Sequence, residues 1–528
     1  MTDLAVACGA DALPRRYATV VDMLADAAAR APAAEALVCE GRRLSYRGYL
    51  ACVAGFAREL ERVGARGGRV ALILGNSLEA AIATFAVHAA GAQLVPLNPS
   101  YTARELRLIL EDAAPSVALY EAASEPTIAP LLRALGIATT IALGPGGRLL
   151  DGWRDGAVAL PARPAPDDLA TLQYTGGTTG RPKGVDLSHR AIAVNVAQRE
   201  ALLPARPDCE RVLCVMPLFH VYAVSMALHL TAYCRGALVI LPRYKPDRVL
   251  QALVEEAITI FPGSPTIFTG LMACAQFGAT DFTRLRLCYS GSSALPEETL
   301  RRWEQAVGCP VHEGYGQTEA GPVLSFNPVG LPSKPGSVGV PVPATELQIV
   351  DPVAGRSVLA VGEPGEIRAR GPQLMAGYRN LPAETAETLR DGWLYTGDIG
   401  ALDADGWLFI RDRKKDMAIV GGYNVYPREV DEVLHLHDGV LEAAAIGVPD
   451  DYRGEIIKAF VVARPGCALE CAELLAHCAR NLAKYKVPAT IEIVPSIPKT
   501  TVGKIDRKEL REMAVGNQGA DRAAAERA

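Results

Sequence analysis

An alternation of strand-like and helix-like segments near the N-terminus most constrains the fold of this chain. Val70–Leu74 and Leu94–Leu97 have the apolar composition of buried strands, and the segment between them is predicted to be a helix. Asn76 and Ser77 are the candidates for its N-cap. Two strands joined through a helix lie parallel in a sheet that helices cover. The same alternation returns twice along the chain, at Ile192–Pro242 and Val249–Gly291.

The pattern changes after about Ser337. Segments shorten, turns multiply and polar residues alternate with apolar ones, which predicts an antiparallel β unit. From Asp416 onward, strands and two helices near Glu429–Leu436 and Glu470–Leu482 predict a small α+β unit. The 528 residues also exceed one ordinary domain of about 100–200 residues. The predicted fold class is α/β and α+β, with parallel-sheet α/β subdomains, then a β-rich subdomain and a small α+β domain.

Composition excludes several classes of protein. Apolar residues make up 49% and charged residues 21% of the chain, as in globular proteins. The formal net charge is −5 and no basic stripe occurs, so no nucleic-acid partner is predicted. The N-terminal residues lack a basic segment followed by a long apolar stretch, so no secretory signal is predicted. Together with 12 cysteines that form no C-x-x-C pair, these features indicate a cytoplasmic protein with reduced thiols.

One uncharged stretch, Val212–Cys234, is long enough to span a bilayer, which takes about 20 residues. Pro217 would break such a helix early, and His220 and His229 would be unfavourable in lipid. A buried strand, a loop and a core helix are predicted here instead.

A loop rich in glycine and threonine carries the first chemical signal. Tyr174–Gly184 reads Y-T-G-G-T-T-G-R-P-K-G. Its glycines let backbone N–H groups turn toward an anion, its threonines add hydroxyl donors, and its lysine adds a mobile cation. No Gly-Lys-Ser/Thr ends the loop, so it is not a Walker A motif. The residues predicted to bind phosphate are Thr175, Gly176, Gly177, Thr178, Thr179, Gly180 and Lys183.

Further motifs follow in order along the chain. They are Met216-Pro-Leu-Phe-His220, Gly314-Tyr-Gly-Gln-Thr-Glu319, Tyr395-Thr-Gly-Asp398, Arg411-Asp-Arg-Lys-Lys-Asp416, Gly421-Gly-Tyr-Asn-Val-Tyr-Pro427 and Gly503-Lys504. With the phosphate loop, this ordered set resembles the signatures of the adenylate-forming superfamily, which includes acyl-CoA synthetases, peptide-synthetase adenylation domains and firefly-type luciferases. The resemblance covers nearly the whole chain and is greatest to bacterial long-chain fatty acid–CoA ligases.

The resemblance implies a nucleoside site. Gly314 and Tyr315 would lie at the nucleotide, where the Tyr315 ring offers an aromatic face to adenine. Asp398 would accept hydrogen bonds from both ribose hydroxyls. Arg413 would make a second ribose contact.

The resemblance also implies the groups that act on the phosphates of ATP. Thr318 would hydrogen-bond a phosphate oxygen, and Glu319 would be the protein ligand of Mg²⁺ because its carboxylate is a hard oxygen donor. Lys504 would bridge the carboxylate of the acid and the α-phosphate. A carboxylate that attacks an anionic phosphorus needs such a cation to offset charge repulsion. Lys499 lies nearby and is expected to matter less.

Two domains follow from the resemblance. An N-terminal adenylation domain, residues 1–412, would hold ATP and the acid, and a small mobile C-terminal domain, residues 413–528, would carry Lys504. Lys415 occupies the position of the hinge about which the small domain swings after adenylation. Gly421 and Gly422 would then line the path of the pantetheine arm of CoA.

The acid itself is constrained by four segments that the resemblance assigns to its pocket. They are His220–Ser225, Gly263–Thr266, Ser290–Ala294 and Val323–Phe326, with His220 as the gate. None contains Lys, Arg, Asp or Glu, which disfavours amino acids and dicarboxylates because their charged groups would need partners. An apolar tail is therefore predicted, and the expected activity is an AMP-forming acyl-CoA synthetase acting on a medium- or long-chain fatty acid.

Several alternatives remain open at this point. The acid could be aryl or alicyclic, or the enzyme could be an acyl-AMP ligase that loads a carrier protein. A catalytically dead homologue is disfavoured because both Lys504 and Glu319 are present. A nucleotide-dependent oxidoreductase is disfavoured because Gly75-Asn-Ser lacks the G-x-G-x-x-G turn. An apolar substrate is compatible with transient peripheral membrane contact, but no amphipathic basic helix indicates it, and the oligomeric state is not readable.

Overall fold

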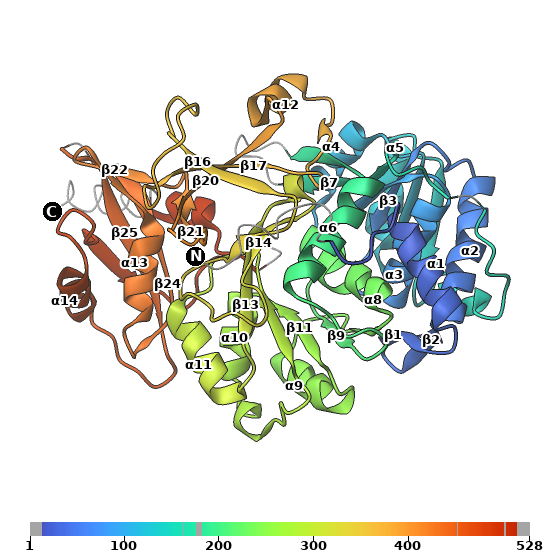
Figure 1. Ribbon diagram of the computed structural model, residues 1–528, viewed down its shortest axis with the longest axis horizontal. Helices are drawn as coiled ribbons and strands as arrows, with labels where there is room; N and C mark the ends of the chain where they lie inside the picture. Colours follow the sequence, from blue (N-terminus) through green and yellow to red (C-terminus); the bar gives the residue numbers. More distant parts are fainter. Residues whose placement is uncertain (1–12, 162, 176–181, 451, 501–502, 515–528) are drawn as a thin grey trace.

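Four β-sheets organise the chain (Figure 1). The computed structural model describes residues 13–161, 163–175, 182–450, 452–500 and 503–514. Within these residues, two large sheets of mostly parallel strands form the N-terminal part. A smaller antiparallel sheet follows, and another small sheet ends the chain. This arrangement confirms the predicted combination of α/β and α+β structure.

The predicted β-α-β unit lies in the first large sheet. β3 (Arg69–Ile73) pairs parallel with β4 (Gln93–Leu97), and α3 (Leu78–Ala89) connects them. Ser77 caps α3, because its hydroxyl accepts a hydrogen bond from the Ala80 N–H at 3.1 Å. In the described residues this sheet has seven strands, in the order β18 (Gly377–Tyr378), β8 (Lys183–Ser188), β7 (Leu169–Thr175), β4, β3, β5 (Val117–Glu121) and β6 (Thr139–Leu143).

The second large sheet carries the two later alternations. Its described strands follow the order β15 (Val340–Pro341), β14 (Val323–Phe326), β13 (Val311–Gly316), β12 (Leu287–Ser290), β11 (Ile260–Gly263), β9 (Arg211–Cys214), β10 (Ala237–Ile240), β1 (Glu35–Cys39) and β2 (Arg42–Ser45). Its outer face is covered by α9 (Pro246–Glu255), α10 (Pro265–Met272) and α11 (Glu297–Val307) (Figure 1).

A layer of helices lies between the two large sheets. It contains α1 (Val20–Arg30), α2 (Tyr46–Arg62), α3, α6 (His189–Leu202) and α8 (Leu230–Cys234) (Figure 1). α3 and α6 each contact strands of both sheets, and every residue of α3 is buried. Ser45 caps α2, because its hydroxyl accepts a hydrogen bond from the Gly48 N–H at 3.2 Å. The sheets and this layer share one hydrophobic core.

The uncharged stretch Val212–Cys234 is divided as predicted. Its start lies in β9, and its later part forms a helical segment made of α7 (Val221–Ala223), the π-helical turn η5 (Val224–His229) and α8. Across the described part of the chain, no helix combines the length and the apolar character that crossing a bilayer requires.

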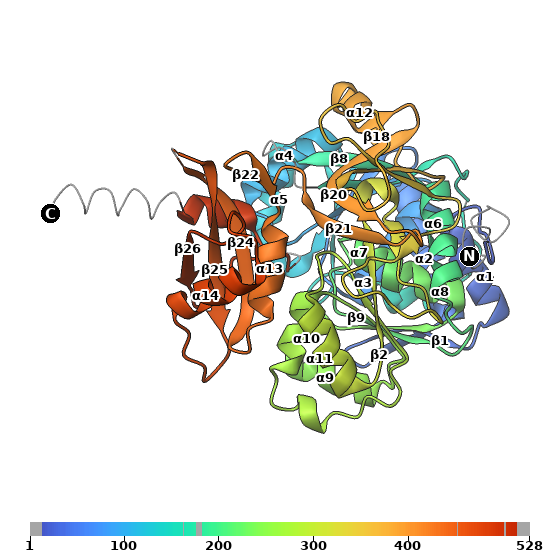
Figure 2. The same ribbon diagram turned by 60° about the vertical axis from the view of Figure 1, so that its left-hand side comes forward.

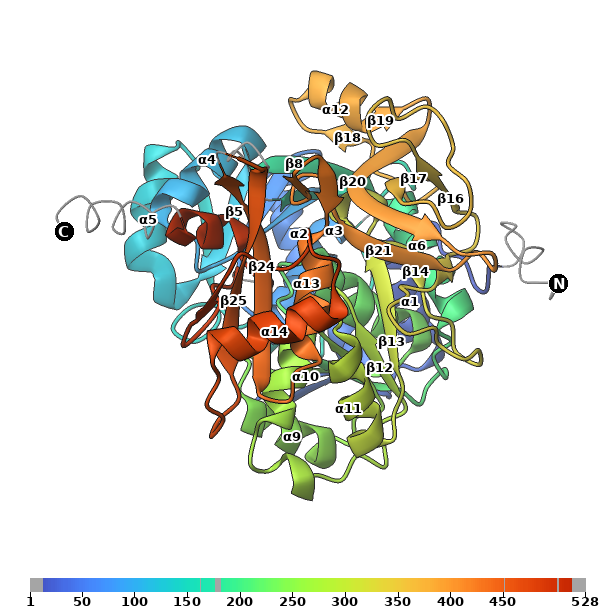
Figure 3. The ribbon, with the colours of Figure 1, turned by 90° about the vertical axis from the view of Figure 1, so that its left-hand side faces the viewer.

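The remaining sheets match the predicted change of pattern. The antiparallel sheet contains β16 (Glu346–Val350), β17 (Gly365–Arg370), β19 (Leu389–Arg390), β20 (Trp393–Leu402) and β21 (Leu408–Arg413). The last sheet contains β22 (Ala418–Val420), β23 (Tyr423–Val425), β24 (Val440–Asp450), β25 (Gly454–Ala463) and β26 (Thr490–Ile493). Figure 3 shows α13 (Pro427–His435) and α14 (Cys471–Asn481) packed together on this last sheet.

The C-terminal unit lies at one end of the molecule (Figures 1 and 2). Its sheet begins at β22, directly after β21 of the preceding sheet. The Asp412 carboxylate accepts a hydrogen bond from the Arg428 N–H at 3.0 Å, and Asp416 pairs with Arg511 at 2.6 Å. The Glu432 carboxylate, on α13, accepts a hydrogen bond from the Glu297 N–H of α11 at 3.4 Å. The domain boundary after residue 412 stays a prediction.

Three histidines are buried in the helical layer. His88, His189 and His229 are each 1% exposed, and the rings of His88 and His189 meet edge to face with their centroids 5.1 Å apart. Burial lowers the pKa of His189 and of His229 to about 3, and it holds the pKa of His88 well below its usual value. All three are neutral at pH 7.

We expect the buried histidines to lower the stability of the folded protein as the pH falls below about 6.5. These histidines stay neutral in the folded state but take up protons near pH 6.5 once unfolded, so acid favours the unfolded chain. The free energy of unfolding should fall by up to about 1.4 kcal/mol per pH unit for each buried histidine. Urea unfolding midpoints between about pH 7.5 and 5.5 measure this, and His229→Leu should weaken the dependence. A pH dependence that is the same in His229→Leu and wild type would contradict the prediction.

Candidate active site

The candidate site lies at one edge of the nine-stranded sheet. β9, β11, β12 and β13 are parallel, so their carboxyl ends meet at this edge. Open α/β sheets bind ligands outside the carboxyl ends of their strands. The motif that starts at Gly314 leaves β13 here and continues into the short helix η7 (Thr318–Ala320).

Two glycines of this motif are required by close packing. A Cβ atom on Gly316 would lie 1.9 Å from the Pro322 carbonyl oxygen, and a Cβ on Gly314 would lie 2.4 Å from the Phe326 ring. Any side chain would therefore push β13 away from β14. The glycines allow the tight antiparallel pairing that places Tyr315 and Glu319 at the edge of the sheet.

Tyr315, Asp398 and Arg413 come together from three strands. The Tyr315 hydroxyl donates a hydrogen bond to Asp398 Oδ2 at 2.6 Å. Asp398 and Arg413 are direct neighbours across β20 and β21, with Arg413 Nε 4.0 Å from Asp398 Oδ1. Burial raises the pKa of Asp398, and the Tyr315 hydrogen bond and the Arg413 charge oppose this rise. The residues predicted to hold the nucleoside thus form one cluster.

Glu319 is buried beside a residue that the motifs did not indicate. Thr318 and Glu319 are each 9% exposed. The Tyr378 hydroxyl, from β18, donates a hydrogen bond to Glu319 Oε1 at 2.8 Å. The ammonium group of Lys183 lies 4.9 Å from the centre of the Tyr378 ring, within cation–π range. Tyr378 therefore connects the end of the phosphate loop to the predicted metal ligand.

The ends of the phosphate loop are held by a hairpin. Thr175 on β7 and Lys183 on β8 are direct cross-strand partners. The predicted phosphate-binding residues between them, Gly176, Gly177, Thr178, Thr179 and Gly180, lie outside the described residues.

Lys504 is brought to this cluster from the C-terminal unit. Its backbone is held in a turn, because the Thr500 N–H donates to the Lys504 carbonyl at 2.7 Å. The Thr266 hydroxyl, from α10, donates to the Gly503 carbonyl at 3.4 Å. Burial, reinforced by the positive charge of Arg413, lowers the pKa of Lys504 to about 8, while the carboxylates of Asp398 and Glu319 act in the opposite direction.

Lys499, in the same segment, has a different environment. Its ammonium group pairs with the Glu442 carboxylate at 2.6 Å within the C-terminal unit. Of these two lysines, Lys504 is therefore the one near the predicted nucleotide residues.

The His220 loop is held by Asn76, the cap candidate that does not cap α3. Asn76 Oδ1 accepts a hydrogen bond from the Leu218 N–H at 2.7 Å, and Asn76 Nδ2 donates to the Met216 carbonyl at 3.1 Å. His220 Nδ1 accepts a hydrogen bond from the Tyr222 N–H at 3.3 Å. Burial, with the nearby charge of Lys504, lowers the pKa of His220 to about 3, so its ring is neutral at pH 7.

The predicted hinge and CoA-path residues are exposed. Lys415 lies between β21 and β22. Gly421 and Gly422 form the turn between β22 and β23 with φ angles of +57° and +85°, which favour glycine. A Cβ atom on either glycine would meet open space. Their roles in domain movement and CoA binding stay predictions.

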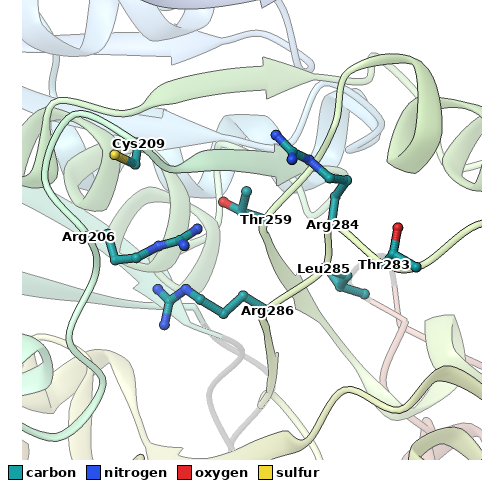
Figure 4. Close-up of a pocket in the computed structure, with 7 residues that line it drawn as sticks. All are labelled: Arg206, Cys209, Thr259, Thr283, Arg284, Leu285 and Arg286. Atoms are coloured by element: carbon teal, nitrogen blue, oxygen red, sulfur yellow. The ribbon is translucent and has the colours of Figure 1, made fainter.

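A cavity of about 440 Å³ lies away from this site (Figure 4). Its residues precede the first residues of β9, β11 and β12, so it opens at the amino ends of the strands, opposite the candidate site. Arg206 and Arg286 project into it (Figure 4), and both pair with the buried Glu210 carboxylate. Two of its three lining arginines are thus paired with a protein carboxylate.

Comparisons with known proteins agree with the geometry. Residues 24–379 match the family model of the AMP-binding enzyme, and residues 429–504 match the model of the AMP-binding enzyme C-terminal domain. A long-chain-fatty-acid–CoA ligase of Bacillus subtilis is 36% identical, over 96% of this chain and 96% of its own. A feruloyl-CoA synthase of Amycolatopsis is 37% identical, over 91% of this chain and 96% of its own.

Solved structures give the same result. ATP-bound MatB from Rhodopseudomonas palustris superposes with a TM-score of 0.86 at 33% identity, covering 94% of this chain and 98% of its own. The anthranilate CoA ligase AuaEII in complex with anthranoyl-AMP superposes with a TM-score of 0.89 at 30% identity, covering 96% and 98%. The chain therefore belongs to the AMP-binding enzyme family, among its adenylate-forming acyl-CoA ligases.

Proposed function

We propose that this enzyme converts a medium- or long-chain fatty acid into its acyl-CoA thioester in two steps. The carboxylate oxygen attacks the α-phosphorus of ATP, which forms acyl-AMP and releases pyrophosphate. The CoA sulfur then attacks the acyl carbon and AMP leaves. The observation that carries this proposal is that the segment of Lys504 lies against the N-terminal part of the chain, where the Thr266 hydroxyl donates to the Gly503 carbonyl at 3.4 Å. The charges of Arg413, Asp398 and Glu319 act on the Lys504 ammonium there.

In the first step the carboxylate of the acid approaches the negatively charged phosphates of ATP. The site therefore needs cations where these two groups meet. Lys504 is the cation that the C-terminal unit supplies, and Asp398 lies where it could hold the ribose beside it. Preorganised charges at such a position stabilise the transition state because they need no reorganisation during the reaction.

The site fits Mg²⁺ bound together with ATP. The described residues contain no group of three or more His, Cys, Asp or Glu side chains suited to a metal, and Glu319 is a buried carboxylate beside the predicted phosphate residues. Mg²⁺ commonly takes one or two protein carboxylates and completes its shell with phosphate and water oxygens. When bound, it would neutralise charge on the departing pyrophosphate.

The second step is proposed to need a movement of residues 413–528 about Lys415, which would withdraw Lys504. The turn at Gly421–Gly422 would then approach the site and admit the pantetheine arm of CoA. Its open surroundings leave room for a ligand beside the backbone.

The fatty-acid assignment is supported by the four pocket segments, which contain no charged side chain. It is also supported by relatives named long-chain-fatty-acid–CoA ligase. An aryl acid is the second candidate, because a feruloyl-CoA synthase and an anthranilate CoA ligase are also similar.

AMP formation with ATP, Mg²⁺ and CoA across a series of acids tests the assignment. The series runs from acetate through octanoate to oleate, with benzoate, coumarate and cyclohexanecarboxylate beside them. Fastest turnover of octanoate or longer chains would support the fatty-acid proposal. Fastest turnover of a ring acid would instead assign an aryl or alicyclic acid as the substrate. Failure to form acyl-CoA from any acid in the series would refute the proposed reaction.

We expect the adenylation rate to fall as the pH rises above about 8, the pKa of Lys504 in the free enzyme. Only the protonated amine carries the charge that the reaction needs, so kcat/KM should fall by about tenfold per pH unit above that pKa. Acid-dependent pyrophosphate release between about pH 6.5 and 9.5 measures it. Lys504→Arg should remove the fall, because guanidinium stays protonated. A wild-type rate that stays level throughout would contradict this role.

A further inference from the structure

The turn that carries Lys504 is held by its own hydrogen bonds. The Gly503 N–H donates to the Thr500 carbonyl at 2.8 Å, and the Lys504 N–H donates to the Thr500 hydroxyl at 3.2 Å. Gly503 has a φ angle of +78°, a left-handed conformation that favours glycine. These contacts fix the shape of the turn, but they all lie inside the C-terminal unit. They do not determine where the turn lies relative to the N-terminal part of the chain.

A hydroxyl group of the N-terminal part contacts this turn. The Thr266 hydroxyl donates its hydrogen bond to the Gly503 carbonyl at 3.4 Å. The two residues are closely packed, because a Cβ atom on Gly503 would lie 3.3 Å from Thr266 Oγ1. Away from the hinge, the Glu297 N–H and the Glu432 carboxylate also join the two units. Of these two contacts, only that of Thr266 reaches the residue next to Lys504.

Thr266 belongs to a firmly packed part of the fold. It is the second residue of α10, which begins at Pro265, shortly after β11 ends at Gly263. Phe268, in the first turn of this helix, is fully buried. Its ring packs edge to face against the buried Trp303 ring, with the two centroids 4.7 Å apart. Because this packing holds the start of α10, the Thr266 hydroxyl has a defined position.

Ser264 orients the Thr266 hydroxyl. Ser264 Oγ and Thr266 Oγ1 lie 3.0 Å apart, and Ser264 is only 3% exposed. A threonine hydroxyl has one proton to donate. Thr266 gives this proton to the Gly503 carbonyl, so Ser264 is the donor in the serine–threonine pair. The Thr266 hydroxyl is thereby directed at the turn that carries Lys504.

This contact belongs to only one of the two arrangements that the proposed reaction requires. Lys504 is proposed to leave the site before CoA enters, and Gly503 directly precedes it, so the hydrogen bond to Thr266 must break. A contact made in one arrangement alone stabilises that arrangement relative to the other. Loss of the contact therefore disfavours the arrangement for the first step and does not impede the second step.

We propose that Thr266, oriented by Ser264, is a positioning residue for adenylation, which holds the turn at Gly503 so that Lys504 reaches the reacting groups. The inference rests on the proposed acyl-CoA synthetase function and adds a residue to its first step. Thr266 acts through Lys504 rather than on the reacting atoms. Its contribution is confined to acyl-adenylate formation.

The test measures the two half-reactions separately in Thr266→Val, which keeps the shape of the side chain but removes its hydroxyl. The acid is whichever of octanoate, oleate and coumarate the wild type uses fastest, and the second step starts from the matching preformed acyl-AMP and CoA. Loss of one neutral hydrogen bond should lower kcat for acid-dependent pyrophosphate release by about three- to tenfold. Thioester formation should be as fast as in the wild type or faster, because the variant favours the second arrangement.

Three further variants assign the effect to this hydroxyl. Thr266→Ser keeps the hydroxyl and should restore the wild-type ratio of the two rates. Thr269→Val removes a hydroxyl one turn along α10 that has no hydrogen bond to the C-terminal unit among the described residues, so it should leave the ratio unchanged. Adding Thr266→Val to Lys504→Met should cause no further fall in pyrophosphate release, because the two residues act together. The ratio is measured within one preparation, so partial loss of folded protein does not change it.

The outcomes separate this inference from the function on which it rests. If Thr266→Val has the wild-type ratio of rates, the inference is wrong and the proposed function stands. The same conclusion follows if both half-reactions slow equally, which indicates damage to the fold or to the acyl pocket. It also follows if KM for the acid rises while kcat is unchanged, because the hydroxyl then binds substrate. If the wild type forms acyl-CoA from no acid, the proposed function fails and this inference fails with it.

Discussion

Replacing Lys504 with methionine is expected to slow acyl-adenylate formation by about 10²–10³-fold. Methionine keeps an unbranched side chain of similar length, but it removes the positive charge that lies beside Arg413, Asp398 and Glu319. The fall should appear in kcat rather than in KM for the acid, because the charge matters most as the carboxylate approaches phosphorus. Acid-dependent pyrophosphate release measures this step directly.

The same variant should retain the second step. Supplied with preformed acyl-AMP and CoA, it should form the thioester at a rate close to that of the wild type, because Lys504 is proposed to leave the site before CoA enters. Lys499→Met is the matched control, because Lys499 lies in the same segment as Lys504 but pairs with Glu442. Equal pyrophosphate release from Lys504→Met and wild type would refute the role of Lys504. Equal losses in both half-reactions would indicate misfolding or a different role.

Replacing Glu319 with glutamine is expected to lower adenylation by about 10²-fold and to raise the Mg²⁺ concentration needed for half-maximal rate. The substitution preserves size and the acceptor for the Tyr378 hydroxyl, which lies 2.8 Å from Glu319 Oε1, but it removes the negative charge. Mg²⁺ prefers anionic oxygen, so the metal bound with ATP would lose its protein ligand. A titration of pyrophosphate release against Mg²⁺ measures both changes.

Two controls separate charge from structure at this position. Glu346→Gln removes an exposed carboxylate that pairs with Arg370 at 2.5 Å, and it should leave the Mg²⁺ titration unchanged. Tyr378→Phe removes the hydrogen bond to Glu319 but keeps the carboxylate, so its effect should be much smaller than that of Glu319→Gln. A Glu319→Gln enzyme with the wild-type Mg²⁺ requirement would rule out Glu319 as a metal ligand.

Much of the site could be predicted because many of its residues lie in short motifs of the sequence. Tyr315 and Glu319 lie in one run of the sequence, and each side chain type suits the group that it would meet. Tyr378 could not be predicted in this way, because it reaches Glu319 only through the addition of β18 to the edge of a distant sheet.

The same distinction between local and long-range features applies to the fold. The β-α-β unit around α3 was predicted because strand and helix patterns are local. The order of strands was not, because pairing of β8 with β18 joins residues far apart in the chain. Asn76 shows how nearby polar residues can differ in role: Ser77 caps the helix, while Asn76 reaches across to the His220 loop.

The helical layer shared by the two large sheets has a consequence for recombining this enzyme with its relatives. A crossover between β1 and α3, or between α6 and β14, would take a helix of this layer and strands of one covering sheet from different parents, so their buried apolar faces would have to fit each other. A crossover between β21 and β22 would interrupt few polar contacts, among them Asp412 with the Arg428 backbone and the Glu297 backbone with Glu432. Exchange of the C-terminal unit, with such contacts matched, is the graft that this architecture tolerates best.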